Sequence, residues 1–486
     1  MTRSLLRTLS IVLGMSIPAS NWSVHAAPQN QPNIIFILAD DLGWADVGCM
    51  GSKFYHTPNI DKLARQGMRF TNFHQSQNCA PTRACLMSGQ YAPRTGIYTV
   101  GSLLRGQPKN RKLVPPVNET KLKPDLKTIA DQLKASGYVT GMFGKWHLGT
   151  QGEYHPARRG FDEAIVVEGD HFNFNTVPPL NIPTQSYDGD WITDRAVEFI
   201  EKHQKAPFFL YVPHRLVHSP LQAKPGATKK YEKIPPVGGQ KNPIYAAMVE
   251  NLDHNIGRIM TKLDELGLMT NTVVVFSSDN GGIGSYREAG ARNVTDNAPL
   301  RGGKGQLYEG GIRAPLIVRW PGIIAPETTN NLLSAHVDIY PTFLEVGGAA
   351  RPAQTLDGVS LVPILRNPAA KLGRDAIYSH FPGYLQGYGG PMWRTTPVGM
   401  IIEGDWKLLE FYEDARFELY NLREDLSENR NLAAVHPERV KALNQKFSAW
   451  REGIGGVMPV EKTAATSAAE EAAAGRKNGQ SRDDED

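Results

Sequence analysis

The most informative segment of the sequence is Cys79-Ala80-Pro81-Thr82-Arg83-Ala84-Cys85-Leu86-Met87-Ser88-Gly89. Proline suits the first position of a helix, so Pro81 predicts that a helix begins there and that Cys79 precedes it. A thiol at that position lies near the positive end of the helix dipole and near the guanidinium of Arg83, and both favour the thiolate. The segment therefore indicates an activated nucleophile at residue 79.

The composition of the whole chain excludes several classes of protein. The 486 residues are 41% hydrophobic and include 47 Gly, 34 Pro and only 3 Cys. Three cysteines cannot staple a disulfide-rich fold, the glycines have no triplet period, and the apolar fraction is too high for a disordered chain. The composition is therefore that of a globular protein with a hydrophobic core, and we expect two domains.

The net charge of +4 is unevenly distributed along the chain. Residues 1–26 carry Arg3 and Arg7 and no acid, whereas residues 461–486 carry four basic and seven acidic residues, so the remainder holds +5. This net charge is small and the sequence contains no run of Lys and Arg residues, so we expect no nucleic-acid partner. A local pocket for an anion is compatible with it.

Short apolar runs end abruptly at polar residues. These runs are 34–38, 138–143, 208–212 and 273–276. They lack strict alternation, which suits strands that are buried on both faces in a parallel sheet. Helical periodicity over 126–136 and 244–266 separates them, so the sequence predicts an α/β sandwich. Because ligands bind beyond the carboxyl ends of such strands, the polar groups that follow them are expected to converge.

Acidic and amide groups follow two of these runs. Asp40 and Asp41 follow the first, and Asp279 and Asn280 follow the last. Their oxygen atoms suit hard cations such as Ca²⁺ or Mg²⁺. Taken singly, the first pair could cap a loop and residues 279–281 could form a turn. Two acidic strand ends in one sheet together favour a metal site.

Basic groups lie in nearby loops. Lys145 and His147 follow the second run, His214 and His218 follow the third, and Lys304 lies in Arg301-Gly302-Gly303-Lys304-Gly305. The last segment lacks the spacing and the Ser/Thr of a P-loop, which disfavours nucleotide binding by that route. Two lysines and two histidines at the end of one sheet would form a small oxyanion site.

The segment around Cys79 resembles the signature of the sulfatase family, in which this cysteine is oxidised to Cα-formylglycine before the chain folds. Thr82 replaces the commoner Ser, and Met87-Ser88-Gly89 replaces the commoner Leu/Met-Thr-Gly, and both changes keep a hydroxyl. Other family landmarks follow in order between about residues 31 and 450: Asp40-Asp41 with Gly43, Gly144-Lys145-Trp146-His147-Leu148-Gly149, His155-Pro156, Gly160-Phe161-Asp162, His218-Ser219-Pro220, Asp279-Asn280-Gly281, and Lys304 before Glu309-Gly310-Gly311. The resemblance implies an alkaline phosphatase-like fold with a large mixed, mostly parallel sheet sandwiched by helices.

The resemblance also implies roles for the site residues. Hydrated formylglycine at position 79 is a diol that attacks sulfur. A divalent cation, Ca²⁺ or alternatively Mg²⁺, would be held by Asp40, Asp41, Asp279, Asn280 and residue 79. Lys145 and Lys304 would flank the sulfate, Arg83 would hold formylglycine, His218 or Lys304 would protonate the leaving oxygen, and His147 would take a proton from the diol so that sulfate is expelled.

Several further residues keep two interpretations. His171, with His74 and Asn173, could face the substrate or be an ordinary polar loop residue, and the same holds for Arg287, Arg292 and Trp393. Cys49 and Cys85 could form a disulfide or both be buried thiols.

The resemblance and the changes in composition along the sequence divide the chain into a signal segment, two domains and a tail. Residues 1–26 have the pattern of a secretory signal, with Arg3, Arg7, an apolar run and a small-residue cleavage site. The apolar run is too short to span a bilayer, so we do not expect a membrane anchor. Residues 27–345 form the expected catalytic domain. Residues 346–460 form a smaller domain with strands over 398–402, 406–411 and 417–420 and a helix over 437–450, and residues 387–393 could overhang the site. Residues 461–486 are expected to be a disordered tail.

The sequence therefore predicts an exported, periplasmic or secreted, sulfatase. Its expected partners are a sulfated carbohydrate or aryl sulfate and, during maturation, a formylglycine-generating enzyme. Two alternatives remain open: a phosphonate or phosphate monoester hydrolase of the same superfamily, and an inactive glycan-binding homologue.

Overall fold

A large mixed sheet forms the centre of the molecule. The computed structural model describes residues 31–287, 293–387, 393–463 and 466. The strand order of the large sheet is β11-β2-β10-β9-β1-β8-β5-β6-β7. Its strands are β1 (Asn33–Ala39), β2 (Met68–Phe70), β5 (Val139–Gly144), β6 (Glu163–Gly169), β7 (Phe174–Val177), β8 (Phe208–Pro213), β9 (Thr272–Ser278), β10 (Leu316–Arg319) and β11 (Thr328–Asn330).

The central strands of this sheet run parallel. β9, β1, β8, β5 and β6 pair in parallel, whereas β10 and β7 pair antiparallel to their neighbours. Ala39 pairs with Ser278 and Leu38 with Pro213, so the chain leaves β1, β8 and β9 at the same edge. The predicted convergence of the polar groups beyond these strands follows directly from this register.

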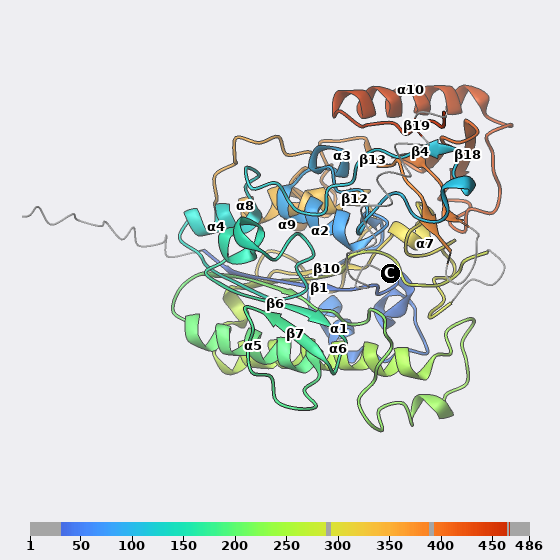
Figure 1. The fold of residues 1–486 in the computed structure, drawn as a ribbon. Coiled ribbons are helices and arrows are strands. Elements are labelled where there is room, and N and C mark those ends of the chain that lie inside the picture. Colours follow the sequence, from blue (N-terminus) through green and yellow to red (C-terminus); the bar gives the residue numbers. More distant parts are fainter. Residues whose placement is uncertain (1–30, 288–292, 388–392, 464–465, 467–486) are drawn as a thin grey trace, which may run out of the picture.

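Helices cover both faces of the large sheet (Figure 1). In β1, Ile35 and Ile37 pack against α1 (Pro58–Arg65), α5 (Asp188–His203) and α6 (Pro243–Glu265). Ile34 and Phe36 pack on the opposite face, where α2 (Cys79–Ser88), α4 (Ile129–Ala135), α8 (Ile339–Gly347) and α9 (Val362–Arg366) lie. After Asn33 the strand is apolar, and both of its faces are buried, which confirms the predicted α/β fold class.

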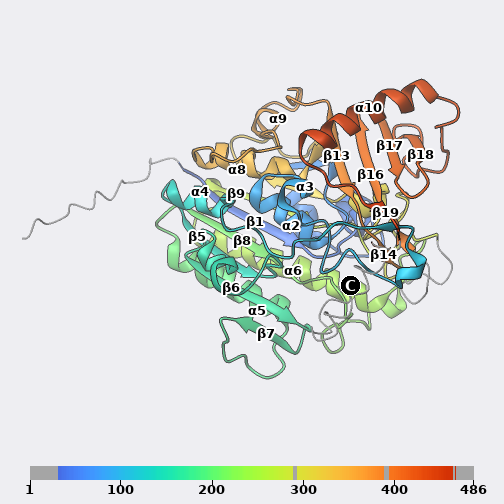
Figure 2. The same ribbon diagram turned by 45° about the horizontal axis from the view of Figure 1, so that its top comes forward.

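A second, antiparallel sheet lies beside the first (Figure 2). Its strands are β13 (Ala376–Phe381), β16 (Val398–Glu403), β17 (Trp406–Phe411) and β18 (Arg416–Asn421). Leu443 and Phe447 of α10 (Pro437–Gly453) pack on one face. The other face buries Met400 and Ile402 with Cys85 of α2. The smaller antiparallel sheet with its helix is confirmed, and it packs directly on the helix that begins with Cys79.

The remaining short elements connect these layers. They are β3 (Phe73–His74), β4 (Leu113–Val114), β12 (Ser334–Ala335), β14 (Leu385–Gln386), β15 (Trp393–Thr395), β19 (Val460–Glu461), α3 (Ala92–Thr95) and α7 (Glu309–Ile312). β19 pairs with β4, so Glu461, the first residue of the expected tail, lies in a strand. α9 packs in the core of the large sheet, although it follows residue 345.

Some sequence expectations concern residues that the structure does not describe, and others are tested by the residues that it does describe. The expected signal segment 1–26, Arg292 and nearly all of the expected tail lie outside the described residues. Cys49 and Cys85 are free thiols in different core clusters, which corrects the disulfide alternative. Within the described ranges, each helix is too short or too polar to cross a bilayer.

Candidate active site

The acidic groups predicted to converge meet in the loops after β1 and β9. The backbone N–H of Asp41 donates to Asp279 Oδ1 at 3.1 Å, and Asn280 Nδ2 donates to Asp41 Oδ1 at 2.8 Å. Asp40, Asp41, Asp279 and Asn280 are at most 1% exposed. Asp41 has a positive φ of 62°, which turns the chain sharply after Asp40. Two adjacent carboxylates thereby both stay at the strand end.

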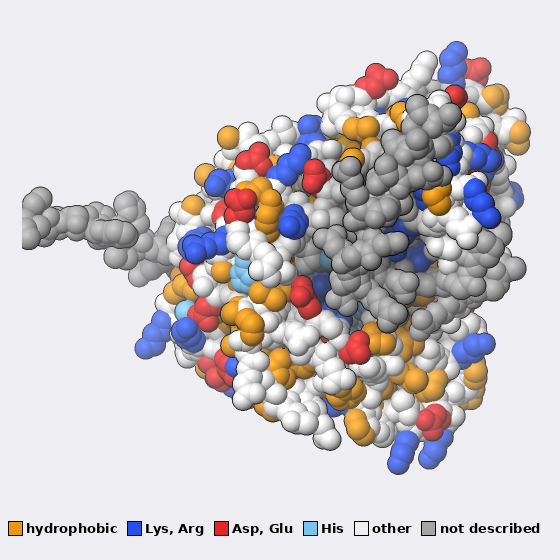
Figure 3. All heavy atoms as spheres, in the orientation of Figure 1, with side chains coloured by type: hydrophobic (Ala, Val, Ile, Leu, Met, Phe, Trp, Pro, Cys, Tyr) orange, Lys and Arg blue, Asp and Glu red, His pale blue; other side chains and the backbone are white. Residues whose placement is uncertain are grey.

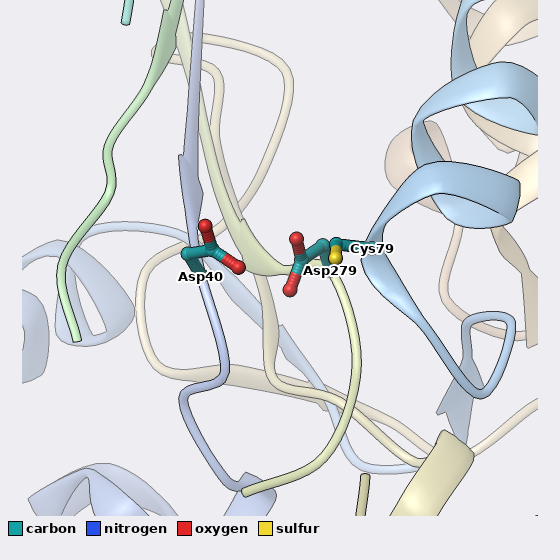
Figure 4. Close-up of side chains that lie close together, drawn as sticks. All are labelled: Asp40, Cys79 and Asp279. Carbon is teal, nitrogen blue, oxygen red and sulfur yellow. The ribbon is translucent and has the colours of Figure 1, made fainter. Parts of the chain in front are cut away.

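Helix α2 brings Cys79 and Arg83 to these carboxylates. Cys79 is the first residue of the helix, which begins two residues before the start at Pro81 that the sequence predicts. Its sulfur lies within 4.8 Å of carboxylate oxygens of Asp40 and Asp279, which are themselves this close (Figure 4). Arg83 is fully buried and donates through Nη2 to Asp279 Oδ2 at 2.7 Å and through Nη1 to the carbonyl of Lys145 at 2.7 Å. Arg83 therefore ties α2 to the loops after β9 and β5.

Lys145 links the sulfur to the carboxylates. Its Nζ lies 2.7 Å from Asp40 Oδ2 and 3.8 Å from Cys79 Sγ. The preceding Gly144 has φ +133°, and a Cβ there would lie 2.0 Å from the carbonyl oxygen of Pro213, so only glycine fits. His147 follows in the same loop and is half-buried, with φ 63°. The expected role of His147 in taking a proton stays a prediction.

Lys304 and His218 close the opposite side of the acidic group. Lys304 Nζ is fully buried and lies 3.0 Å from Asp41 Oδ2 and 3.2 Å from His218 Nε2. His218 Nε2 lies 3.6 Å from Asp41 Oδ2, and its side chain is 13% exposed. This partial exposure lets His218 meet a ligand that enters from solvent, whereas Lys304 acts from within the protein.

Burial and charge set the ionisation of the carboxylates in opposite directions. Burial favours the neutral form of Asp40, but Lys145 and the other positive groups outweigh it and hold its pKa well below the usual range. Burial raises the pKa of Asp279, and the negative charge of Asp40 raises it further against the pull of Arg83. Crowded carboxylates of this kind are stabilised by additional positive charge.

The oxygen atoms at this site fit a hard divalent cation. Asp40 Oδ1 and Asn280 Oδ1 are buried, and neither accepts a hydrogen bond from a described residue. Buried oxygens without donors are costly, and oxygen ligands are those that Ca²⁺ and Mg²⁺ prefer. The sulfur of Cys79 and the imidazole of His218 lie beside the same carboxylates. These oxygen ligands therefore suit a bound cation better than a further hydrogen-bond donor.

Other residues singled out in the sequence lie elsewhere. His171 is fully buried, with Nδ1 2.9 Å from Asp188 and Nε2 2.8 Å from the carbonyl of His218, so it lies behind the site rather than facing a ligand as expected. His74 is buried against Glu309, at 3.1 Å. Arg287 donates to Asn429, and Asn173 is exposed.

The structure adds residues that sequence reasoning missed. Arg394 of β15 is buried and donates to the carbonyl of Lys304 at 3.4 Å, while Gln306 donates back to the carbonyl of Arg394 at 2.8 Å. On the other side, the Tyr245 hydroxyl donates to Asp46 at 2.6 Å and to the carbonyl of Asp41 at 3.3 Å. Strand β15, which pairs with β14, and helix α6 thus support the two loops that carry Lys304 and Asp41.

The surface around the site carries dispersed charge. Figure 3 shows histidine and basic side chains in the middle of one face, with other Lys and Arg side chains scattered around it. Side chains of both charges are interspersed on this face, in agreement with a net charge of only +4.

Comparison with known proteins identifies the family. The Sulfatase family model matches residues 32–349, and that of the N-sulphoglucosamine sulphohydrolase C-terminal region matches residues 303–452. The chain is 34% identical to a sulfatase of Formosa agariphila (86% of this chain, 88% of that protein) and 31% identical to human arylsulfatase A (85% and 86%). The crystal structure of Ps i-CgsB in complex with k-i-k-neocarrahexaose superposes with a TM-score of 0.73 at 29% identity, covering 91% of this chain and 98% of that one. The chain therefore belongs to the sulfatase family and is a sulfuric ester hydrolase.

Proposed function

We propose that this chain hydrolyses sulfate esters of a carbohydrate outside the cytoplasm, with residue 79 converted to formylglycine and with a bound divalent cation. One observation carries the proposal: an unbroken series of contacts joins Cys79 to Lys145, Asp40, Arg83 and Asp279 on one side and continues through Asp41 to Lys304 and His218. These groups come from six separate parts of the sequence and meet at one edge of the sheet.

The surroundings of Cys79 support its role as the precursor of the nucleophile. The side chain is buried at the N-terminus of α2, with the ammonium of Lys145 3.8 Å from its sulfur. Positive charge at this point favours an oxyanion as well as a thiolate. Formylglycine supplies, in its hydrated form, a hydroxyl that attacks sulfur and a second hydroxyl that allows the aldehyde to be restored. Arg83 fixes the first turn of the helix that carries residue 79.

The charge balance of the site supports a cation and an anionic substrate. The carboxylates of Asp40, Asp41 and Asp279 are matched by the three permanent positive charges of Arg83, Lys145 and Lys304. Asp40, Asp41, Asp279 and Asn280 would hold Ca²⁺ or Mg²⁺, with residue 79 beside them. Such an ion supplies Lewis-acid stabilisation of sulfate oxygen and gives the site two excess positive charges. A singly charged sulfate ester is attracted to that excess.

Proton transfer is assigned to the two histidines at the site. His218 is the partly exposed member of the Lys304 pair, so it is placed to donate a proton to the leaving oxygen. Lys304 is fully buried and holds His218 in position through the 3.2 Å contact, and it is the second candidate for the donor. His147 would take the proton from the second hydroxyl of residue 79.

The substrate class rests on the relatives and on the N-terminal segment. Ps i-CgsB was solved in complex with k-i-k-neocarrahexaose, and human N-acetylgalactosamine-6-sulfatase, by name a carbohydrate sulfatase, is 31% identical over 70% of this chain. Residues 1–26 have the pattern of an export signal, which favours a periplasmic or secreted polysaccharide-degrading enzyme. A formylglycine-generating enzyme would be required as the partner during maturation.

The test is sulfate release from a panel of defined sulfated mono- and disaccharides, with 4-nitrophenyl sulfate and 4-nitrophenyl phosphate assayed in parallel. We expect turnover of at least one sulfated sugar and a sulfate rate that exceeds the phosphate rate. A preference for the phosphate would support a phosphomonoesterase instead. Binding of the sugars without any release of sulfate would support an inactive glycan-binding homologue.

A further inference from the structure

A buried histidine behind the site holds the loop that carries His218. His171 lies between β6 and β7, and its side chain is 0% exposed. Its Nδ1 lies 2.9 Å from Asp188 Oδ2 at the start of α5, and its Nε2 lies 2.8 Å from the backbone carbonyl of His218. The backbone N–H of His171 also donates to Gln222 Oε1 at 3.0 Å. His171 thus contacts the segment that follows β8 at two points.

The two ring nitrogens of His171 both face oxygen atoms. Nδ1 lies 2.9 Å from a carboxylate oxygen of Asp188, and Nε2 lies 2.8 Å from the carbonyl oxygen of His218, so the ring is held between the start of α5 and the His218 backbone. Arg215, with Nε 3.3 Å from Asp188 Oδ2, holds the same carboxylate from a second side. Hydrogen bonds to a carboxylate are stronger than those between neutral groups, so this carboxylate fixes the orientation of the His171 ring.

The contact with His171 restrains the backbone of His218, which carries the ring that faces Lys304. The N–H of His218 donates to the carbonyl of Arg215 at 2.9 Å, while its own carbonyl accepts from His171. Its backbone is therefore held from both sides. Its ring has Nδ1 2.5 Å from the carbonyl of Ser219 and Nε2 3.2 Å from Lys304. Without the contact to His171, the carbonyl of His218 loses this buried partner and the peptide is held less firmly.

We propose that His171 is a positioning residue for proton donation by His218: paired with Asp188, it fixes the His218 carbonyl and so aims His218 Nε2 at the leaving oxygen. This inference rests on the proposed function, because it assigns His171 to the donor named there. It predicts that replacement of His171 lowers kcat/KM more for a substrate whose leaving group depends more on protonation.

The experiment measures kcat/KM of the metal-loaded, formylglycine-containing enzyme on 4-nitrophenyl sulfate and phenyl sulfate. Phenolate is the poorer leaving group, so proton donation matters more for it. We expect His171→Gln to lose about tenfold or more on phenyl sulfate and several-fold less on 4-nitrophenyl sulfate, since a glutamine amide cannot donate to both acceptors. His218→Ala should show the same pattern, and the double variant should be no slower than His218→Ala alone.

A matched control separates positioning from general damage. His74 is also a fully buried histidine paired with a carboxylate, but it contacts Glu309 rather than the His218 loop. His74→Gln should slow both substrates by the same factor. An equal loss on both substrates for His171→Gln, or additive losses in the double variant, would overturn the inference while leaving the proposed function intact.

A second measurement does not depend on turnover of aryl sulfates. The crystal structure of the His171→Gln enzyme should show His218 withdrawn from Lys304, whereas the His74→Gln structure should retain the contact. An unmoved His218 in the first variant would overturn the inference. Absence of sulfate release from every ester by the wild-type holoenzyme would instead contradict the proposed function itself.

Discussion

The ammonium group of Lys145 lies 3.8 Å from the sulfur of Cys79, and both side chains are buried at the carboxyl end of the large sheet. A fixed positive charge at this distance stabilises negative charge that develops on a group attached to residue 79. Lys145→Ala is therefore expected to lower kcat by about 10²–10³-fold, the range typical for loss of one electrostatic stabiliser. Lys205→Ala, which removes an exposed lysine, is the control and should keep full activity. Sulfate release by both variants is the measurement.

Replacement of the nucleophile precursor should separate activity from folding. Cys79→Ser preserves the size of the side chain in its buried position at the first turn of α2, so circular dichroism and the midpoint of thermal unfolding should change little. The variant should lose turnover by about 10⁴-fold or more, because serine cannot provide the two hydroxyls of a hydrated aldehyde. Full activity of Cys79→Ser would show that residue 79 does not react as proposed.

Removal of the cation should abolish turnover and lower stability. Asn280 presents a buried oxygen without a donor, so Asn280→Ala should weaken Ca²⁺ binding without changing the charge of the site. Thermal unfolding during a Ca²⁺ titration of chelator-treated protein should show that this variant needs more Ca²⁺ than wild type for the same rise in midpoint. Asn331→Ala, at an exposed position, should titrate like wild type. Identical titrations of all three proteins would place the cation elsewhere.

Acid should destabilise the fold through buried histidines. Burial lowers the pKa of His214, His336 and His380 to about 4, compared with about 6.5 in the unfolded chain. Between these values the unfolded state binds more protons, so the free energy of unfolding falls as the pH falls from about 6.5 to 4, by on the order of 3 kcal/mol for each histidine. Asp46 acts in the opposite direction, because burial raises its pKa to about 6 and the folded state then holds its proton more tightly.

The comparison of variants isolates this effect from the opposing acids. Denaturant unfolding of wild type, His380→Gln and the exposed His254→Gln at pH 7.5 and pH 5 gives the loss of stability on acidification. His380→Gln should lose less than wild type, and His254→Gln should match wild type. A loss in His380→Gln as large as that in wild type would mean that His380 does not titrate differently in the two states.

The convergence of the acidic residues was predictable because neighbouring parallel strands end at the same edge of a sheet. The apolar run before Asp40 predicts β1, and the run before Asp279 predicts β9; once both strands are parallel neighbours, their following residues must lie together. The helix at Cys79 was predictable for a local reason, since Pro81 favours the first turn. These features depend on short-range patterns and on one rule of topology.

The supporting residues could not be found in the same way. His171 shows no local signal, because its role is fixed by Asp188 and by the carbonyl of His218, which is 47 residues away in the chain. Arg394 reaches the carbonyl of Lys304 from a strand pair beside the smaller sheet, across 90 residues. Such contacts depend on how the layers pack, and a histidine or arginine in a loop has the same sequence pattern whether it faces solvent or a buried carbonyl.

The most direct test of the account is mass spectrometry of the tryptic peptide spanning residues 70–83, prepared from enzyme whose turnover has been measured. The account predicts that residue 79 carries an aldehyde, or its hydrate, in a fraction of molecules that rises in proportion to specific activity across preparations. Fully active enzyme in which this peptide retains an unmodified cysteine thiol would contradict it.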